Sequence, residues 1–219
     1  MQDFIEVTGM VLKAVPVLEM DKRITILTKE RGKLSAFARG AKRQGSRFMA
    51  ATNPFCYGTF RLYEGKTAYN LSDVKIDQYF EGLREDFEGA FYGMYFTDVA
   101  DYYTRENNDE KDMLKLLYAS LKALEKPAIP NELVQYIFEM KTITVNGEFP
   151  GVIQGHELTE SAAYTISYVQ NSPIEKLYTF TVSEEVMGQL ARECEHYRKK
   201  YMGHNFKSLE ILQNCRLKN

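Results

Sequence analysis

Residues 23–39 decide the fold of the N-terminal part and run Arg23-Ile-Thr-Ile-Leu-Thr28-Lys-Glu-Arg-Gly32-Lys-Leu-Ser-Ala-Phe-Ala-Arg39. Two short segments, rich in Ile, Thr and Leu on one side and in Leu, Ala and Phe on the other, flank a charged turn. The glycine of that turn is free to adopt a positive φ. This pattern predicts a β-hairpin whose strands cover residues 23–28 and 34–39.

Three more segments of the same kind surround this hairpin. Val, Ile, Thr, Phe and Tyr predict strands over residues 5–14, 59–63 and 68–76, and the turn Glu64-Gly65-Lys66 joins the last two as a second hairpin. Five short strands cannot hide both faces of an open sheet. We therefore expect a closed five-stranded barrel of the OB type, with an SH3-like barrel as the structural alternative.

Beyond Gly82 the hydrophobic period changes from two residues to about 3.6, which predicts helices. From Leu83 onward, one helical stripe that we expect to pack tightly contains Phe87, Phe91, Met94, Tyr95, Val99 and Tyr102. Further helices are expected over residues 111–124, 131–145, 161–169 and 184–201, with Ser183 as the N-cap of the last. The sequence thus predicts an α+β protein with a barrel domain over residues 1–80 and a helical domain over residues 81–219.

Composition and targeting signals narrow the class of protein. The 219 residues are 44% hydrophobic and 26% charged, which is typical of globular domains. No apolar run could span a bilayer, and the N-terminus lacks the pattern of an export signal. The three cysteines, Cys56, Cys194 and Cys215, are widely spaced and odd in number, as in proteins of a reducing compartment. We therefore expect a cytoplasmic protein.

The net charge of −2 conceals an uneven distribution. Residues 1–50 contain ten Lys and Arg against five Asp and Glu, whereas residues 51–219 contain eighteen against twenty-five. The two parts therefore differ in sign, at +5 and −7. A concentrated positive charge beside an acidic remainder favours binding of a polyanion to the N-terminal part. A solvated basic face without a partner is the alternative.

The densest positive charge follows the central hairpin. Between Lys33 and Arg47 no acidic residue occurs, and Gly40 and Gly45 predict a mobile loop that leaves a strand. Phosphates require charge and reach rather than precise geometry, so such a loop suits nucleic acid. The predicted DNA-binding residues are Lys22, Arg23, Arg31, Lys33, Arg39, Lys42, Arg43 and Arg47.

Aromatic residues interleave with these cations, namely Phe37, Phe48, Phe55 and Tyr57. An exposed aromatic ring can stack on a base without reading its identity. A position in the core is the other interpretation, and it is favoured for Phe37 and Phe55.

A second basic region lies near the C-terminus, where Arg198, Lys199, Lys200 and Lys207 alternate with apolar residues. Cations that border an apolar helical surface could bind DNA or an acidic peptide with hydrophobic side chains. A helix with one wet face and one core face produces the same pattern.

Enzyme signatures are missing from the sequence. Neither the phosphate-binding G-x-x-x-x-G-K-[ST] motif nor a G-x-G-x-x-G motif occurs, which argues against nucleotide hydrolysis and dinucleotide cofactors. Cys56 has no histidine in a recognisable context to act as its base. Cys194 and His196 lie two residues apart on a predicted helix and face different ways, so the sequence predicts no zinc site. We expect a protein that is not an enzyme and has no cofactor, and an unrecognised hydrolase has no positive support.

In this order, the segments resemble the DNA repair protein RecO family over nearly the whole chain. The residues that carry the resemblance are Val7-Thr-Gly9-Met-Val-Leu-Lys13, Asp21-Lys22, Leu27-Thr28-Lys-Glu30-Arg31-Gly32-Lys33, Ala38-Arg39-Gly40-Ala41-Lys42-Arg43, Ser46-Arg47, Pro54-Phe55, Leu83-Arg84-Glu85-Asp86, Pro173-Ile-Glu-Lys, Ser183-Glu-Glu and the stretch from Gly203-His204 to Lys207-Ser208. The pieces Thr-Lys-Glu-Arg-Gly-Lys and Ala-Arg-Gly-Ala-Lys-Arg are the most specific.

The resemblance implies a recombination mediator that binds single-stranded and double-stranded DNA, anneals complementary strands without ATP and helps RecR to load RecA. It also implies that basic residues of the N-terminal half bind DNA and that the helical domain receives the C-terminal tail of single-stranded DNA-binding protein. A bacterial, nucleoid-associated location would follow.

One departure from the family and one rival function remain. Many members carry a four-cysteine zinc motif after the helix that here ends near Asn146, but residues 152–168 contain no cysteine. We therefore expect ordinary packing or a shortened loop in that region.

The rival function is a protein-interaction adaptor with weak or no DNA binding. Salt dependence would distinguish the two, because counterion release makes DNA affinity fall steeply with salt.

Overall fold

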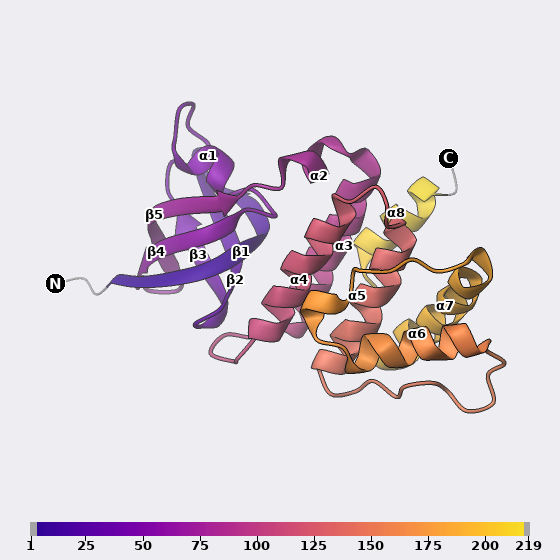
Figure 1. The fold of residues 1–219 in the computed structure, drawn as a ribbon. Helices are drawn as coiled ribbons and strands as arrows, with labels where there is room; N and C mark the ends of the chain where they lie inside the picture. The colour runs from indigo at the N-terminus through magenta and orange to yellow at the C-terminus, as the bar shows by residue number, and fades with distance from the viewer. Residues whose placement is uncertain (1–3, 217–219) are drawn as a thin grey trace.

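The computed structural model describes residues 4–216 and places a β-barrel at the N-terminal end of a helical bundle (Figure 1). The barrel part contains β1 (Phe4–Val17), β2 (Asp21–Thr28), β3 (Gly32–Ala38), α1 (Phe48–Ala51), β4 (Tyr57–Tyr63) and β5 (Tyr69–Gln78). The helical part contains α2 (Glu81–Glu85), α3 (Phe87–Tyr103), α4 (Lys111–Leu124), α5 (Asn131–Val145), α6 (Glu160–Asn171), the 3₁₀ helix η1 (Ile174–Lys176), α7 (Glu184–Tyr197), the π-helix η2 (Arg198–Met202) and α8 (Lys207–Arg216). None of these helices is long and apolar enough to cross a bilayer.

The five strands close in the order β1-β2-β3-β5-β4, with β4 pairing back onto β1. All pairs are antiparallel except β3 with β5, which is parallel. Residues alternate between the barrel interior and the outside, so Ile24, Ile26, Leu34 and Ala36 are buried from the hairpin. The OB-type barrel is therefore confirmed, and the SH3-like alternative is set aside.

Two apolar cores hold the chain together, and the barrel contributes to both. The barrel interior forms one cluster around Phe60. The second cluster fills the helical bundle and also takes in Met10, Leu12, Leu27 and Phe55 from the barrel. One outer side of the barrel is thus covered by helices, and the barrel and the bundle share buried apolar surface.

The helix expected from Leu83 onward is interrupted at Asp86. Asp86 leaves the helical region with φ −85° and ψ 106°, and its carboxylate accepts from the Glu88 N–H to begin α3. The predicted packing stripe is wrong for Phe87, Met94 and Tyr102, which are 72%, 47% and 39% exposed. The buried face keeps Tyr95 and Val99 of the predicted stripe and adds Tyr92, Phe96 and Ala100. The helix α3 is apolar on several sides, and α4, α5 and α8 cover this one.

The last long helix begins as expected and ends earlier. The Ser183 hydroxyl accepts from the Val186 N–H at 3.3 Å, which confirms the predicted N-cap. After Tyr197 the chain continues as one π-helical segment rather than as α-helix to residue 201. Arg198, the first residue of that segment, reaches Glu139 of α5 with a distance of 2.6 Å from Nη1 to Oε2.

Candidate nucleic-acid interface

The connection between β3 and α1, residues 39–47, projects from the barrel beside α1 (Figure 1). It carries Arg39, Lys42 and Arg43, whose side chains are exposed and make no hydrogen bond or ion pair with the described residues. Gly45 adopts φ +75°, and a Cβ added to it would meet nothing within 4 Å, so this part of the connection stands in open space. We call residues 39–47 the cationic loop.

The base of the cationic loop is fixed to the start of β2. The Gly40 N–H donates to Asp21 Oδ1 at 2.7 Å, and the Lys42 N–H donates to the Met20 carbonyl at 2.9 Å. Ala41 is buried in the barrel interior between these two anchors. The backbone is therefore held at one place while the three charged side chains remain available to a ligand.

Arg23 and Arg47 flank the loop and are exposed but tethered. Arg23 Nε donates to Ser35 Oγ at 2.8 Å, and its guanidinium lies 5.9 Å from the centre of the Phe37 ring. Arg47 bridges to β5, with Nη1 2.9 Å from Asp73 Oδ1 and Nη2 donating to the Ser72 carbonyl. Each guanidinium has five N–H donors, so both retain donors for phosphate.

Lys22 and Lys33 have partners within the protein. Lys22 Nζ donates to the Met49 carbonyl, Thr52 Oγ1 and Asn53 Oδ1, and burial lowers the pKa of this ammonium from its ordinary value. Lys33 Nζ lies 2.9 Å from Asp101 Oδ1 of α3, at the junction with the helical part. We assign both side chains to holding the fold.

Arg31 is exposed in the turn between β2 and β3, at the other end of the hairpin from the cationic loop. The five residue steps from Arg23 to Thr28 span roughly 17 Å. The predicted set of eight cations therefore separates into a group of five around the loop, two structural lysines and one distant arginine.

The aromatic residues of this region are mostly covered. Phe55 is 4% exposed, and the Tyr57 ring packs on Tyr118 at 4.8 Å between centroids. Phe37 and Phe48 are half-buried, each beneath an arginine guanidinium. None of these four rings offers a free face for base stacking comparable with the exposed cations.

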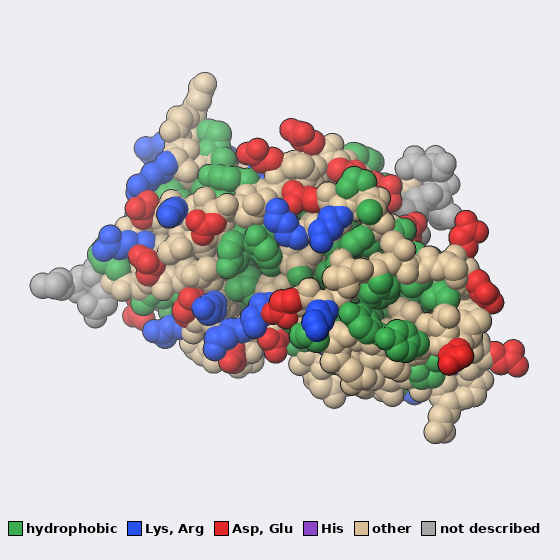
Figure 2. All heavy atoms as spheres, in the orientation of Figure 1, with side chains coloured by type: hydrophobic (Ala, Val, Ile, Leu, Met, Phe, Trp, Pro, Cys, Tyr) green, Lys and Arg blue, Asp and Glu red, His purple; other side chains and the backbone are tan. Residues whose placement is uncertain are grey.

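Charge follows the division between barrel and helices. Residues 1–80 contain thirteen Lys and Arg against eight Asp and Glu, and residues 81–219 contain fifteen against twenty-two. On the face shown in Figure 2, blue side chains gather over the barrel and its junction with the bundle, whereas red side chains occupy the far end of the bundle. A polyanion is therefore attracted to the barrel end of the molecule.

The predicted C-terminal cations do not form one free group. Arg198 is half-buried and paired with the buried Glu139, and Lys199 is paired with Glu195 at 2.6 Å. Lys200 lies over the Tyr201 ring at 5.3 Å, while Lys207 is exposed at the start of α8. A cavity of about 480 Å³ between η2 and α8 includes Arg198 and Lys199 beside Met202, Phe206 and Leu209.

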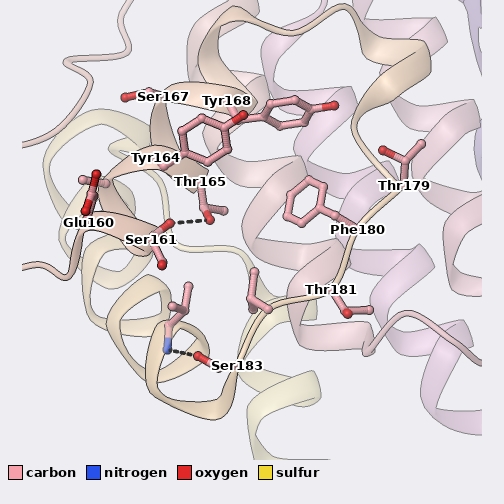
Figure 3. Close-up of a pocket in the computed structure, with 13 residues that line it drawn as sticks. Glu160, Ser161, Tyr164, Thr165, Ser167, Tyr168, Thr179, Phe180, Thr181 and Ser183 are labelled. Atoms are coloured by element: carbon pink, nitrogen blue, oxygen red, sulfur yellow. Dashed lines mark hydrogen bonds between the residues drawn. The ribbon is translucent and has the colours of Figure 1, made fainter.

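A larger groove lies elsewhere, between α6 and the segment 179–183, with a volume of about 940 Å³ (Figure 3). Tyr164 and Tyr168 project from α6 on one side, and Phe180 faces them from the segment on the other side. Tyr164 is 68% exposed. Glu160 is the one charged residue in the lining, so this groove does not supply the cations predicted for an acidic tail.

Histidine, cysteine and carboxylate side chains are not arranged as a metal site in the part of the chain that the structure describes. His156 in the connection between α5 and α6 instead lies 2.7 Å from Glu193 Oε1 of α7. This contact links the region without cysteines to the bundle.

Two family models match the chain in sequence. The model described as Recombination protein O N terminal matches residues 1–80, and the model described as Recombination protein O C terminal matches residues 84–154. The chain belongs to the DNA repair protein RecO family. The resemblance found in the sequence is thereby confirmed, and RecO membership gives the chain a role in DNA repair.

Relatives in the RecO family align over most of the chain. DNA repair protein RecO of Acetivibrio thermocellus is 27% identical and the alignment covers 96% of this chain and 97% of that protein. DNA repair protein RecO of Clostridium perfringens is also 27% identical, with 95% and 97% covered. DNA repair protein RecO of Bacillus pumilus is 32% identical over 67% of this chain and 57% of its own length.

Proposed function

We propose that this protein binds single-stranded DNA at the barrel end and anneals complementary strands without ATP. The observation that carries the proposal is the cationic loop, in which Arg39, Lys42 and Arg43 are exposed and unpaired among the described residues while the loop base is anchored to β2. OB-type barrels bind oligonucleotides at the face of strands 2 and 3 and at the loops between strands 1 and 2 and between strands 4 and 5. The cationic loop follows strand 3 and is hydrogen-bonded to the end of the loop between strands 1 and 2.

The mechanism needs charge and access but no catalytic side chain. Cations neutralise phosphates and release condensed counterions, which lowers the repulsion between two strands. Contacts to the backbone leave the base edges free to pair. Arg23 and Arg47 extend the positive surface on either side of the loop, so a strand can follow the barrel end over several phosphates.

A triple charge reversal tests the proposal. In Arg39→Glu/Lys42→Glu/Arg43→Glu, we expect binding of a labelled single strand to weaken strongly at low salt and annealing of complementary oligonucleotides to slow. Each lost phosphate contact lowers the slope of log affinity against log salt by about 0.7, so three contacts lower it by roughly 2. Fluorescence anisotropy and a fluorescence annealing assay measure the two effects.

A matched control carries the same charge change in the helical part. The variant Lys126→Glu/Lys176→Glu/Arg192→Glu replaces three exposed cations that make no ion pair with the described residues. It should keep the salt slope of the unaltered protein. Equal loss in the two triple variants, or an unchanged slope in the loop variant, would contradict the assignment of DNA binding to the loop.

Family membership supports extending the proposal to partners. We infer that the protein acts with RecR and with the C-terminal tail of single-stranded DNA-binding protein to help load RecA, and that it also binds double-stranded DNA on the bacterial nucleoid. Among the predicted cations for the tail, Lys207 is exposed, and Lys199 borders the cavity beside Phe206 and Leu209. Lys199→Glu/Lys207→Glu should weaken binding of a tail peptide without changing the affinity for DNA.

The second candidate function is a protein-interaction adaptor, which the groove beside Tyr164 favours because aromatic side chains are over-represented in protein interfaces. An adaptor without DNA binding would show protein partners whose affinity changes little with salt. Absence of both DNA binding and annealing at low salt would favour it over the proposed function.

A further inference from the structure

The turn that joins β1 to β2 exposes apolar side chains in an unfavourable backbone conformation. Leu18 is 83% exposed and Met20 is 45% exposed, and Val15 near the end of β1 is 44% exposed. Leu18 also adopts φ +53°, in the left-handed region that residues other than glycine, asparagine and aspartate rarely occupy. Neither the exposure of this apolar side chain nor its positive φ contributes to the stability of the fold. Backbone outliers of this kind concentrate at functional sites.

This turn lies directly against the cationic loop. The Met20 carbonyl accepts from the Lys42 N–H at 2.9 Å, and the Asp21 carboxylate holds the Gly40 N–H. Met49 of α1, which is 37% exposed, joins the same end of the barrel, since its carbonyl accepts from Lys22 Nζ. Apolar side chains and unpaired cations are therefore fixed beside each other.

A ligand that satisfies both surfaces carries regular negative charge and flat apolar faces. A single strand of DNA has both, because its phosphates alternate with bases whose faces are accessible when they are not paired. Apolar side chains such as Leu and Met contact base faces in other DNA-binding proteins, and in a duplex they must first unstack a base step at a cost of a few kcal/mol. A continuous duplex buries those faces in its stack and offers only phosphates to the loop.

We propose that Leu18, supported by Met20, contacts the faces of unpaired bases in DNA whose phosphates are bound by the cationic loop. This inference rests on the proposed function and adds to it a recognition element for bases without sequence specificity. Surfaces that bind only phosphate do not distinguish a strand with bases from one without them. The Leu18 turn gives this surface a preference for unpaired strands.

An abasic strand separates the two parts of the interaction. It has the same number of phosphates as an oligothymidine of equal length but no bases, so the cationic loop meets the same charge in both. We expect the unaltered protein to bind oligothymidine more tightly than the abasic strand. In Leu18→Asn, affinity for oligothymidine should fall on the order of tenfold, toward that of the abasic strand, because the apolar contact is lost. Affinity for the abasic strand should stay unchanged.

The choice of asparagine controls for folding, and two further variants, Leu18→Phe and Phe87→Asn, control for the chemistry and the position of the side chain. Asparagine tolerates the left-handed conformation, so Leu18→Asn should leave the stability of the turn intact. Leu18→Phe should retain or increase the preference for oligothymidine, since an aromatic ring stacks on bases. Phe87→Asn removes another exposed apolar side chain on α3 and should not change affinity for either strand.

The outcomes distinguish this inference from the proposed function. Equal affinity of the unaltered protein for oligothymidine and the abasic strand overturns the role of Leu18 while salt-dependent binding of both strands persists. A Leu18→Asn variant with an undiminished preference overturns it as well. Binding of neither strand at low salt would overturn the proposed function itself, and the inference with it.

Discussion

The ammonium groups of Lys22 and Lys42 belong to the same end of the barrel and meet different surroundings. Lys22 donates to three oxygen atoms of the segment 49–53 and thereby fastens the short helix α1 to β2. Lys42 uses only its backbone N–H in the fold and leaves its side chain exposed. At the scale of single residues, the hydrogen-bond partners rather than the charge distinguish a structural lysine from one whose side chain is left available to a ligand.

This distinction could not be predicted from the sequence. The sequence of residues 22–47 predicts a basic surface. Thr52 and Asn53, which accept hydrogen bonds from Lys22, lie about thirty positions further along the chain. Asp101, which pairs with Lys33, lies 68 positions away. A local signal was overlooked for the surface beside the cationic loop: Leu18 and Met20 are apolar residues in a turn, where polar residues are usual.

Arg198 gives a prediction about stability. The Glu139 carboxylate is fully buried and accepts from Arg198 Nη1, the Tyr95 hydroxyl and Gln135 Nε2. In Arg198→Ala, the carboxylate would lose its counter-charge, and we expect the free energy of unfolding to fall by about 3–5 kcal/mol. Urea denaturation measures this change.

The exposed pair of Lys199 with Glu195 serves as the comparison. Lys199→Ala removes a cation one residue along the chain, but both members of this pair face solvent, so the loss should stay below about 1 kcal/mol. Similar losses in the two variants would show that burial of Glu139 is not what makes Arg198 important.

At the scale of elements, the hairpin of β2 and β3 has one end attached to the helical part and one end away from it. Its turn is held by the connection between α3 and α4, where the Lys33 N–H donates to the Arg105 carbonyl and the Asn107 N–H donates to the Arg31 carbonyl. Its other end leads into the cationic loop. Two glycines with similar positive φ values mark these ends, Gly32 at +63° and Gly45 at +75°.

These glycines predict different responses to the same substitution. Gly45→Ala incurs only the cost of the left-handed conformation, so we expect a loss of about 1–2 kcal/mol in the free energy of unfolding. In Gly32→Ala the new Cβ would also lie 2.3 Å from the Arg105 carbonyl oxygen, which forces the hairpin away from the helical part. We expect at least twice the loss of Gly45→Ala in denaturation experiments.

Equal losses at Gly32 and Gly45 would mean that the junction yields easily. Hydrogen exchange of the Lys33 amide gives a second readout, because its protection depends on the bond to Arg105. It should decrease in Gly32→Ala and stay unchanged in Gly45→Ala.

The five strands and most of the long helices could be predicted, since alternation and helical period were visible in the sequence, whereas α1, η1 and α8 were not predicted. The break at Asp86 and the π-helical segment at Arg198 could not be predicted, because the apolar pattern continues through both positions. The exposed position of Phe87 was missed for a related reason. A helix with apolar residues on several sides does not reveal which side its neighbours cover.

At the scale of the whole molecule, barrel and bundle are joined by a common core. Phe55 of the barrel part adopts φ +73° and is 4% exposed, and it belongs to the apolar cluster of the helices rather than to the barrel interior. Its ring lies beside α3, where a Cβ on Gly93 would approach Phe55 Cζ to 3.0 Å. The glycine thus permits close contact between the two parts.

Phe55→Ala should therefore destabilise both parts together. We expect the free energy of unfolding to fall by about 3–5 kcal/mol, as for a buried phenylalanine in other proteins. Far-ultraviolet circular dichroism reports mainly on the helices, and hydrogen exchange reports on the β-strands separately. Both methods should report the same loss in the free energy of unfolding, whereas Phe87→Ala should change neither value by more than about 0.5 kcal/mol.

Different free energies of unfolding for helices and strands in Phe55→Ala would contradict a single cooperative unit. In that case the shared apolar surface would contribute little to the coupling of the two parts.

The attachment of the β2–β3 turn to the helical part has an evolutionary consequence. Insertions in the turn at residues 29–31 would break its backbone hydrogen bonds to the α3–α4 connection and would be removed by selection. Insertions near Gly45, beyond the backbone hydrogen bonds of Gly40 and Lys42, meet no such constraint, because this part of the loop stands in open space and the entropy of closing a loop rises by only about 0.6 kcal/mol for each doubling of its length. Lineages can therefore lengthen, shorten or recharge the tip of this loop while the inherited barrel stays as stable as before.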